Sequence, residues 1–189
     1  MPEKQIRTFI AIALLPEVRA ALGQVSSELA LQMPPRAVRW VKPDLMHVTL
    51  RFLGGTAVSL LPQLMAALDQ VAAQHGRFEL TVNGLGCFPN RKRPRVIWAG
   101  LRGDLAPANN LVAGLNELLL PMGWEPEKRP FRPHLTLGRV KDSRKLQGIH
   151  WGTAVAEIVV EVTAVHLIES QLRPFGPIYT VRHSRKLGD

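Results

Sequence analysis

The sequence predicts an α+β fold in which one arrangement of strands and helices occurs twice. Short β-branched and apolar runs alternate with longer segments of helical periodicity along the 189 residues. The sequence His-x-Thr-Leu occurs at residues 47–50 and again at residues 134–137, each time inside a strand-like run. No low-complexity linker divides the chain. We therefore expect one domain, residues 1–189, with related halves near residues 1–90 and 91–189.

The first half is expected to alternate between strands and helices. Pro16 lies in the first turn of a helix, where proline is tolerated, and Gly76 is a suitable helix stop. Residues 33–41 contain two prolines and are expected to form a loop ending in a short strand. The first motif strand should stop at Gly54-Gly55. The expected strands are residues 7–14, 45–53 and 78–82, and the expected helices are residues 16–31 and 59–75.

The second half repeats this alternation. Residues 88–94 are expected to form a basic turn, and residues 142–151 a short helical or irregular piece. One long or two short strands should occupy residues 156–170. The remaining expected elements are strands at residues 96–101, 133–140 and 178–182 and a helix at residues 107–120.

Composition narrows the possible partners and compartments. Lys and Arg number 24 against 15 Asp and Glu, a net charge of +9, so polyanions such as nucleic acid or phosphorylated metabolites are plausible partners. A generically basic protein is the alternative on charge alone. The single cysteine, Cys87, excludes an intramolecular disulfide and fits the cytoplasm, where we expect the protein. The apolar run at residues 8–15 is too short for a membrane span and is expected to be a buried strand.

Each His-x-Thr motif offers an imidazole and a hydroxyl on one side of a strand. Alternate strand residues share a face, so His47 and Thr49 point one way, as do His134 and Thr136. A single strand histidine is more often structural than catalytic, but two matched frames are much harder to explain by chance. Two opposed imidazoles can supply the proton acceptor and the proton donor that opening of a phosphodiester ring requires. The threonine hydroxyls suit hydrogen bonds to phosphoryl oxygens.

Several neighbouring residues are candidates for substrate contacts. Arg51 is four residues after His47 and is expected on the same strand face, where it would bind the substrate phosphate. Arg139 is five residues after His134 and would point away unless the strand bulges, which the glycine at 138 makes feasible. The loop residues Arg91, Lys92 and Arg93 are either a solvated turn or a contact to the phosphate backbone of a nucleic acid. Phe131, next to the second motif, is a candidate for the pocket edge.

No metal or cofactor is expected. The chain has no His-Glu-x-x-His, no paired cysteines and no Asp-rich loop. It also has no Walker-type glycine loop.

The chain resembles the two-histidine (2H) phosphoesterases, and within them the bacterial and archaeal RNA 2',3'-cyclic phosphodiesterases, also called 2'-5' RNA ligases. The resemblance covers nearly the whole chain. The matching segments are Arg7-x-Phe9-Ile10-Ala11, Trp40-Val41, residues 47–54, Phe88-Pro89, residues 95–98, Phe131-x-Pro133 with residues 134–139, Ser170, and Gly176-Pro177-x-Tyr179.

The resemblance implies a bilobal α+β fold with two antiparallel sheets backed by helices and a central cleft. It implies hydrolysis of RNA 2',3'-cyclic phosphate ends to 2'-phosphomonoesters by a monomer, without a cofactor. His47 would protonate the departing 3' oxygen and His134 would activate water, while Thr49 and Thr136 would hold the phosphoryl oxygens. Arg139 and Phe9 would line the pocket.

Other functions remain open from sequence. The same pair of histidines would serve 2'-5' ligation of RNA, including tRNA halves, or hydrolysis of 2'-5' oligonucleotides or cyclic nucleotides. A binding module for RNA ends that lacks turnover is the non-enzymatic alternative.

Overall fold

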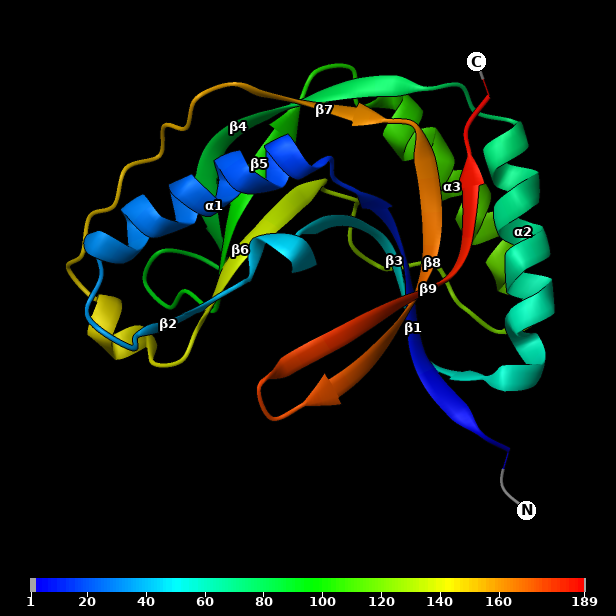
Figure 1. The fold of residues 1–189 in the computed structure, drawn as a ribbon, viewed down its shortest axis with the longest axis horizontal. Helices are drawn as coiled ribbons and strands as arrows, with labels where there is room; N and C mark the ends of the chain where they lie inside the picture. The colour runs from blue at the N-terminus through cyan, green and yellow to red at the C-terminus, as the bar shows by residue number, and fades with distance from the viewer. Residues whose placement is uncertain (1–2, 189) are drawn as a thin grey trace.

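The computed structural model describes residues 3–188, and its centre is a strongly curled antiparallel sheet (Figure 1). The main path of the sheet runs β7-β4-β5-β6-β3-β1-β8-β9, and β2 pairs with β6 beside it. The strands are β1 Gln5–Ala13, β2 Val38–Trp40, β3 His47–Ala57, β4 Phe78–Phe88, β5 Val96–Arg102, β6 His134–Val140, β7 Ile158–Val162, β8 Ala164–Arg173 and β9 Gly176–Lys186.

The helices are α1 Pro16–Leu31, α2 Leu61–Ala73 and α3 Ala106–Leu119. Four short 3₁₀ helices within the described residues join the elements: η1 Pro43–Leu45, η2 Val58–Leu60, η3 Leu120–Met122 and η4 Ser143–Leu146. The α+β class with antiparallel sheets and flanking helices is confirmed. The helix predicted at residues 16–31 is found with those bounds, because its proline occupies the first turn. None of the helices in the described range 3–188 is both long and apolar enough to cross a membrane.

The sheet consists of two groups of strands that meet at one residue pair. One group is β3, β1, β8 and β9, the other is β7, β4, β5 and β6 with β2, and the two are joined by the pair Val48–Leu135 of β3 and β6. The groups do not follow the sequence halves on either side of residue 90. The early strand β4 lies in the second group, and the late strands β8 and β9 lie in the first.

Two expected strand ends are wrong for the same reason. The first motif strand does not stop at Gly54-Gly55, because β3 continues to Ala57 while pairing with β1. The strand expected at residues 78–82 continues to Phe88 as β4. Gly54 and Gly84 adopt positive φ angles of 71° and 72°, so each glycine bends its strand without ending it.

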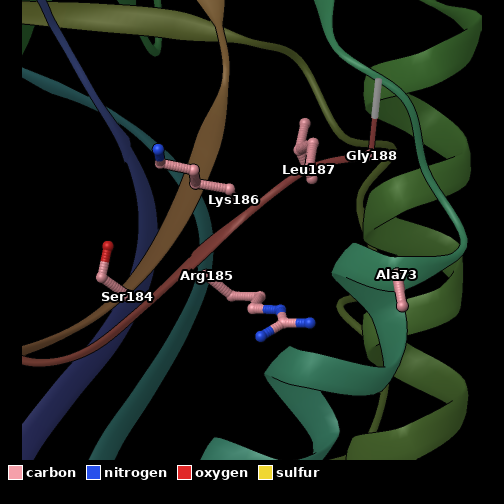
Figure 2. A pocket seen from close by; sticks show the side chains of 6 residues that line it. All are labelled: Ala73, Ser184, Arg185, Lys186, Leu187 and Gly188. Atoms are coloured by element: carbon pink, nitrogen blue, oxygen red, sulfur yellow. The ribbon is translucent and has the colours of Figure 1, made fainter.

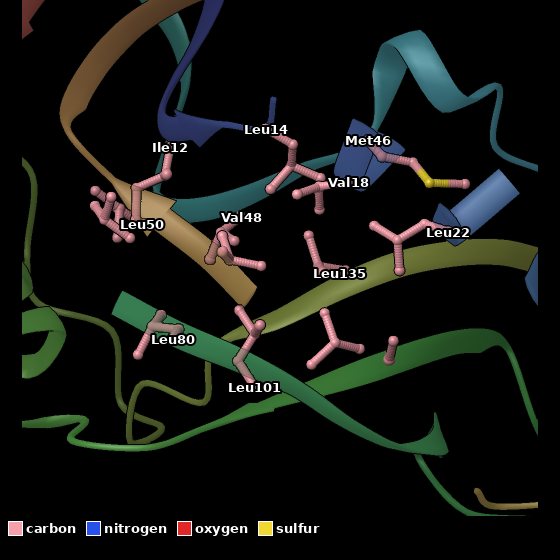
Figure 3. Close-up of a cluster of buried hydrophobic side chains, with 14 of the residues drawn as sticks. Ile12, Leu14, Val18, Leu22, Met46, Val48, Leu50, Leu80, Leu101 and Leu135 are labelled. Atoms are coloured by element: carbon pink, nitrogen blue, oxygen red, sulfur yellow. The ribbon is translucent and has the colours of Figure 1, made fainter. Parts of the chain in front are cut away.

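The apolar core lies on the side of the central strands that faces away from the two motif histidines. Val48 of β3 and Leu135 of β6 are fully buried in it, together with side chains of α1 such as Leu22 (Figure 3). Because strand side chains alternate, the same packing that buries Val48 and Leu135 turns the intervening polar residues to the other face.

Candidate active site

The two His-x-Thr motifs lie together because their strands pair at the centre of the sheet. Val48 and Leu135 are antiparallel partners with buried side chains. His47 and Thr49 flank Val48 on the opposite face, and His134 and Thr136 flank Leu135 there. Antiparallel pairing thus sets each histidine across from the threonine of the other motif, about a local two-fold axis.

All four of these side chains are half-buried. The charge of His134 also acts on His47. The four residues expected at the centre of the site are therefore brought together.

A β-bulge in β6 brings Arg139 to the same face. The register between β5 and β6 shifts between Thr136 and Gly138, so Leu137 is the extra residue. An extra residue reverses the alternation beyond it, which turns Arg139 to the side of His134. Arg139 is exposed, and its charge acts on His47 and on Tyr179. The bulge on which the expectation for Arg139 depended is present.

An equivalent bulge in β3 removes Arg51 from the site. The register of β3 against β1 shifts between Thr49 and Arg51, with Leu50 as the extra residue. Arg51 therefore points to the opposite face, where it is 5% exposed, donates a hydrogen bond to the Glu125 carbonyl and pairs with Glu127 at 3.5 Å. The expectation that Arg51 shares the face of His47 is wrong. Phe52, which is 60% exposed and contacts Phe9, takes that place.

Both histidines are held in the same tautomer by the same local contact. Nδ1 of His47 lies 2.8 Å from the Leu45 carbonyl, and Nδ1 of His134 lies 2.8 Å from the Arg132 carbonyl. A carbonyl oxygen only accepts, so each Nδ1 must carry a hydrogen and donate it. Each Nε2 is then available either to take a proton or, in the imidazolium, to give one. The two rings are chemically matched in this respect.

Each histidine also contacts two aromatic rings that pack against each other. Phe9 and Tyr179 have ring centroids 4.8 and 5.5 Å from that of His47. Phe88 and Trp98 lie 5.1 and 6.3 Å from His134 in the same way. Phe9, expected at the pocket, is 4% exposed and contacts the His47 ring directly.

The electrostatic surroundings of His47 favour its neutral form. Burial lowers the pKa of His47, and the positive charge of Arg139 lowers it further, while the hydrogen bond to the Leu45 carbonyl acts in the opposite direction. Burial raises the pKa of Tyr179, against the influence of Arg139. Bound anionic phosphate would reverse part of the effect on His47, because a negative charge stabilises the imidazolium.

Phe131 does not lie at the edge of the histidine pocket. It lines a small cavity with Arg51, Asn116 and Glu127 on the opposite side of the sheet. The expectation for Phe131 is therefore wrong, because the chain that precedes β6 approaches the motif strand from the face that carries Arg51.

The three basic loop residues, Arg91, Lys92 and Arg93, are exposed and follow Phe88, which contacts His134. The backbone amides of Lys92 and Arg93 both donate to the side chain of residue 90, so the loop is closed by its own hydrogen bonds. The loop thus presents positive charge beside the histidine face.

Arg91 is anchored more firmly than its two neighbours. Its guanidinium lies 4.8 Å from the centre of the Trp151 ring and donates to the Trp151 carbonyl at 3.3 Å. This stacking ties the base of the loop to the segment between η4 and β7, so Arg91 supports the loop as well as exposing charge.

Three of the aromatic neighbours of the motif histidines were not predicted from the sequence. Phe88, Trp98 and Tyr179 were noted only within the segments that carry the family resemblance, without a role at the site. Phe88 and Trp98 reach His134 because β4 pairs with β5 and β5 with β6. Tyr179 reaches His47 because β1 pairs with β8 and β8 with β9. No local pattern in the sequence carries that information.

A hollow in the described surface lies elsewhere. It is formed by Ala73 at the end of α2 and by residues 184–188 at the end of β9 (Figure 2). It contains none of the motif residues, so the candidate site is identified by the chemistry of its side chains and not by the size of a cavity.

The chain is similar to known proteins over most of its length. The model of the family described as LigT like Phosphoesterase matches residues 12–98 and 104–179. The chain is 35% identical over 189 residues to an RNA 2',3'-cyclic phosphodiesterase of Thermus thermophilus, which covers 93% of this chain and 87% of that protein. It is 32% identical over 154 residues to a protein of the same name from Aeropyrum pernix, covering 79% and 86%.

Solved structures give the same result for the fold. The crystal structure of Escherichia coli LigT complexed with 3'-AMP is similar with a TM-score of 0.83 at 26% identity, covering 98% of this chain and 100% of that one. A crystal structure of a Thermus thermophilus protein has a TM-score of 0.81 at 33% identity, covering 97% and 100%.

Proposed function

The chain belongs to the LigT-like phosphoesterase family, and from that premise we propose that it is an RNA 2',3'-cyclic phosphodiesterase. It hydrolyses the cyclic phosphate at an RNA 3' end to a 2'-phosphomonoester, without a metal ion. The observation that carries the proposal is the pair of Nδ1-anchored histidines, His47 and His134, on adjacent strands. Curated relatives with this activity in their names support the choice of substrate.

The reaction needs one proton removed and one delivered. His134 Nε2 takes a proton from water as the water oxygen attacks phosphorus. The bond between phosphorus and the 3' oxygen breaks, and His47 Nε2–H protonates that departing oxygen. The phosphate stays on the 2' oxygen, and exchange with solvent returns both histidines to their starting forms.

The remaining residues of the face hold the phosphate. The hydroxyls of Thr49 and Thr136 donate to the non-bridging oxygens, and Arg139 offsets their negative charge. Phe9 packs against the His47 ring and holds it in place. The loop of residues 91–93 lies beyond Phe88 and contacts the RNA backbone. We further propose that the protein acts in the cytoplasm as a monomeric single domain, on RNA fragments such as those of tRNA or on cyclic nucleotides.

The central test removes each histidine in turn. His47→Ala and His134→Ala should each lower kcat by about 10²–10⁴-fold on an oligonucleotide with a 2',3'-cyclic phosphate, because each loses one proton transfer. The exposed His150→Ala is the matched control and should keep full activity. Circular dichroism confirms folding, and EDTA should leave the wild-type rate unchanged. Normal turnover by either site variant would contradict the two-histidine mechanism.

A modified substrate assigns the two roles. If sulfur replaces the departing 3' oxygen, the leaving group is a thiol that is far more acidic than an alcohol and needs little protonation. His47→Ala should regain most of its lost rate on this substrate, and His134→Ala should not. The opposite pattern would exchange the acid and the base. Phosphorus NMR of the product of the natural substrate identifies the 2'-phosphomonoester.

A further inference from the structure

We propose that Arg51 is a positioning residue that sets the orientation of His134 by holding the segment that enters β6. Only the kinetic test of this role rests on the proposed function. It replaces the phosphate-binding role expected for Arg51, from which the β3 bulge removes it.

Strand β6 holds the segment that leads into the first motif. β2 immediately precedes η1 and β3, and it pairs with β6 through Trp40–Gly138. The amide of Val41 continues this ladder by donating to the Leu137 carbonyl at 2.8 Å. Gly138 permits the close approach, since a Cβ there would meet Trp40 at 3.0 Å. The entry to His47 is thus fixed by backbone hydrogen bonds.

Strand β3 holds the segment that leads into the second motif, but through side chains. Residues 123–133 form no helix or strand. Two side-chain bonds replace the ladder: Trp124 Nε1–H donates to the Leu53 carbonyl at 2.9 Å, and Arg51 donates to the Glu125 carbonyl. Arg51 also pairs with Glu127 at 3.5 Å.

The two motif strands therefore use the same position for the same task. The residue four places after the motif histidine is Arg51 on β3 and Gly138 on β6. Each holds the segment that enters the other motif, the glycine by allowing close backbone pairing and the arginine by donating from its side chain.

The burial of Arg51 supports a specific task. Its side chain is only 5% exposed, and its Nε has no hydrogen-bond partner among the described residues. Asn116 Oδ1 of α3 lacks one as well and lines the same small cavity. Burying a guanidinium with incomplete partners is unfavourable compared with an apolar residue of similar size. Stability alone therefore gives a poor reason for an arginine here.

The held segment acts on the imidazole directly. The carbonyl that accepts the Nδ1–H bond of His134 belongs to Arg132, seven residues after Glu125 in the same segment. Prolines at 126, 130 and 133 fix three φ angles between the Arg51 contact and the histidine, so the segment transmits a displacement with little slack. If Arg51 releases Glu125, the Arg132 carbonyl moves and the direction of His134 Nε2 changes with it.

The kinetic experiment uses Arg51→Met, which keeps the bulk and removes the donors. We expect kcat on a 2',3'-cyclic mononucleotide to fall by about 10–100-fold, since an error of about 1 Å in a reacting group has that effect. KM should stay nearly unchanged, because Arg51 does not touch the phosphate. The control is Leu68→Ala, at a fully buried site in α2, assayed where both variants are folded. An unchanged kcat for Arg51→Met, or an equal loss of kcat in both variants, would overturn the proposal. A rise in KM alone would also overturn it, because it would indicate that Arg51 binds the substrate phosphate.

A second readout does not depend on activity. Nitrogen-15 spectra of the histidine rings report which ring nitrogen carries the hydrogen. In Arg51→Met the His134 signals should shift away from the Nδ1–H form, while those of His47 should not. In Arg51→Ala, which leaves the space of the guanidinium group empty, millimolar guanidinium should restore both the His134 signals and the rate. Unchanged His134 signals would refute the positioning role even if the proposed substrate were wrong.

Discussion

His47 carries the clearest electrostatic signature of any single residue in the site. Burial lowers its pKa below the ordinary value near 6.5, and Arg139 contributes through its positive charge. We predict that a proton NMR titration, with the signal assigned from His47→Asn, gives a pKa below that value. Arg139→Gln should raise it, because a positive neighbour is removed. Lys186→Gln at the far end of β9 is the control and should leave it unchanged. If the pKa of His47 is the same in Arg139→Gln as in the wild type, Arg139 does not lie at the phosphate site.

The same shift has a consequence for stability. The unfolded chain binds a proton at the ordinary histidine pKa, whereas the folded chain binds it only at lower pH. The contribution of His47 to the free energy of unfolding is therefore complete above about pH 6.5 and is lost as pH falls through the folded pKa. Urea unfolding between pH 8 and 5 should show a smaller loss in His47→Asn than in the wild type.

At this scale the motif residues were predictable from the sequence, but not all of their neighbours were. The faces of His47, Thr49, His134 and Thr136 followed from alternation alone, because each motif precedes its bulge. Arg51 follows a bulge, and the extra residue there is a leucine whose chemistry gives no warning. The expectation for Arg51 was therefore wrong for a reason that only strand register reveals.

Among the elements, β2 depends most visibly on a single residue. A Cβ on Gly138 would lie 2.6 Å from Val38 Cγ1 and 3.0 Å from the Trp40 ring, and Val38 is buried. Gly138→Ala should lower the free energy of unfolding by about 1–3 kcal/mol through overpacking. The matched control is Gly152→Ala, where a Cβ would meet nothing within 4 Å. Equal urea midpoints for the two variants would show that β2 can move away from β6 at no cost.

The elements themselves were largely predictable, and their ends were less so. Helices α1, α2 and α3 follow from apolar periodicity with proline near each start. The ends of β3 and β4 were misplaced because glycine was interpreted as a stop. In both strands a positive-φ glycine lies inside the ladder, where pairing to β1 or β5 outweighs its local preference.

For the molecule as a whole, the repeated motif predicts duplication but not the exchange of elements between the two groups of strands. α1 follows β1 yet packs against β6 and β7, and α3 follows β5 yet packs against β3. The chain therefore crosses between the groups several times, and the pairing of β3 with β6 joins them into one sheet. Local patterns define each element but leave open the partner on which it packs. The site itself was predictable because its two strands carry matching residues at the crossing point.

The net positive charge of the whole molecule influences whether the protein prefers a short or a long nucleic-acid substrate. A single strand that contacts lysines and arginines releases counterions, and the logarithm of the binding constant falls with the logarithm of salt concentration by about 0.7 per contact. A cyclic mononucleotide reaches only the motif face, whereas an oligonucleotide can pass the loop beyond Phe88. We predict the effect of Lys92→Gln/Arg93→Gln, made in an inactive variant, on this dependence of binding on salt. For the oligonucleotide, the slope of the logarithm of the binding constant against the logarithm of salt concentration should become shallower by about 0.7 for each residue replaced. Binding of the mononucleotide should be unchanged.

The control for this measurement removes the same charge from another face. Arg185→Gln/Lys186→Gln lies on β9 beside the hollow at the end of α2, and the weak ion pair of Arg185 with Asp69, at 3.9 Å, is surface-exposed. If the +9 charge acts only as a general field, both double variants should change the slope equally. If the loop contacts the strand, only the loop variant should change it. The comparison, made in His134→Ala to prevent turnover, separates a built contact from overall attraction.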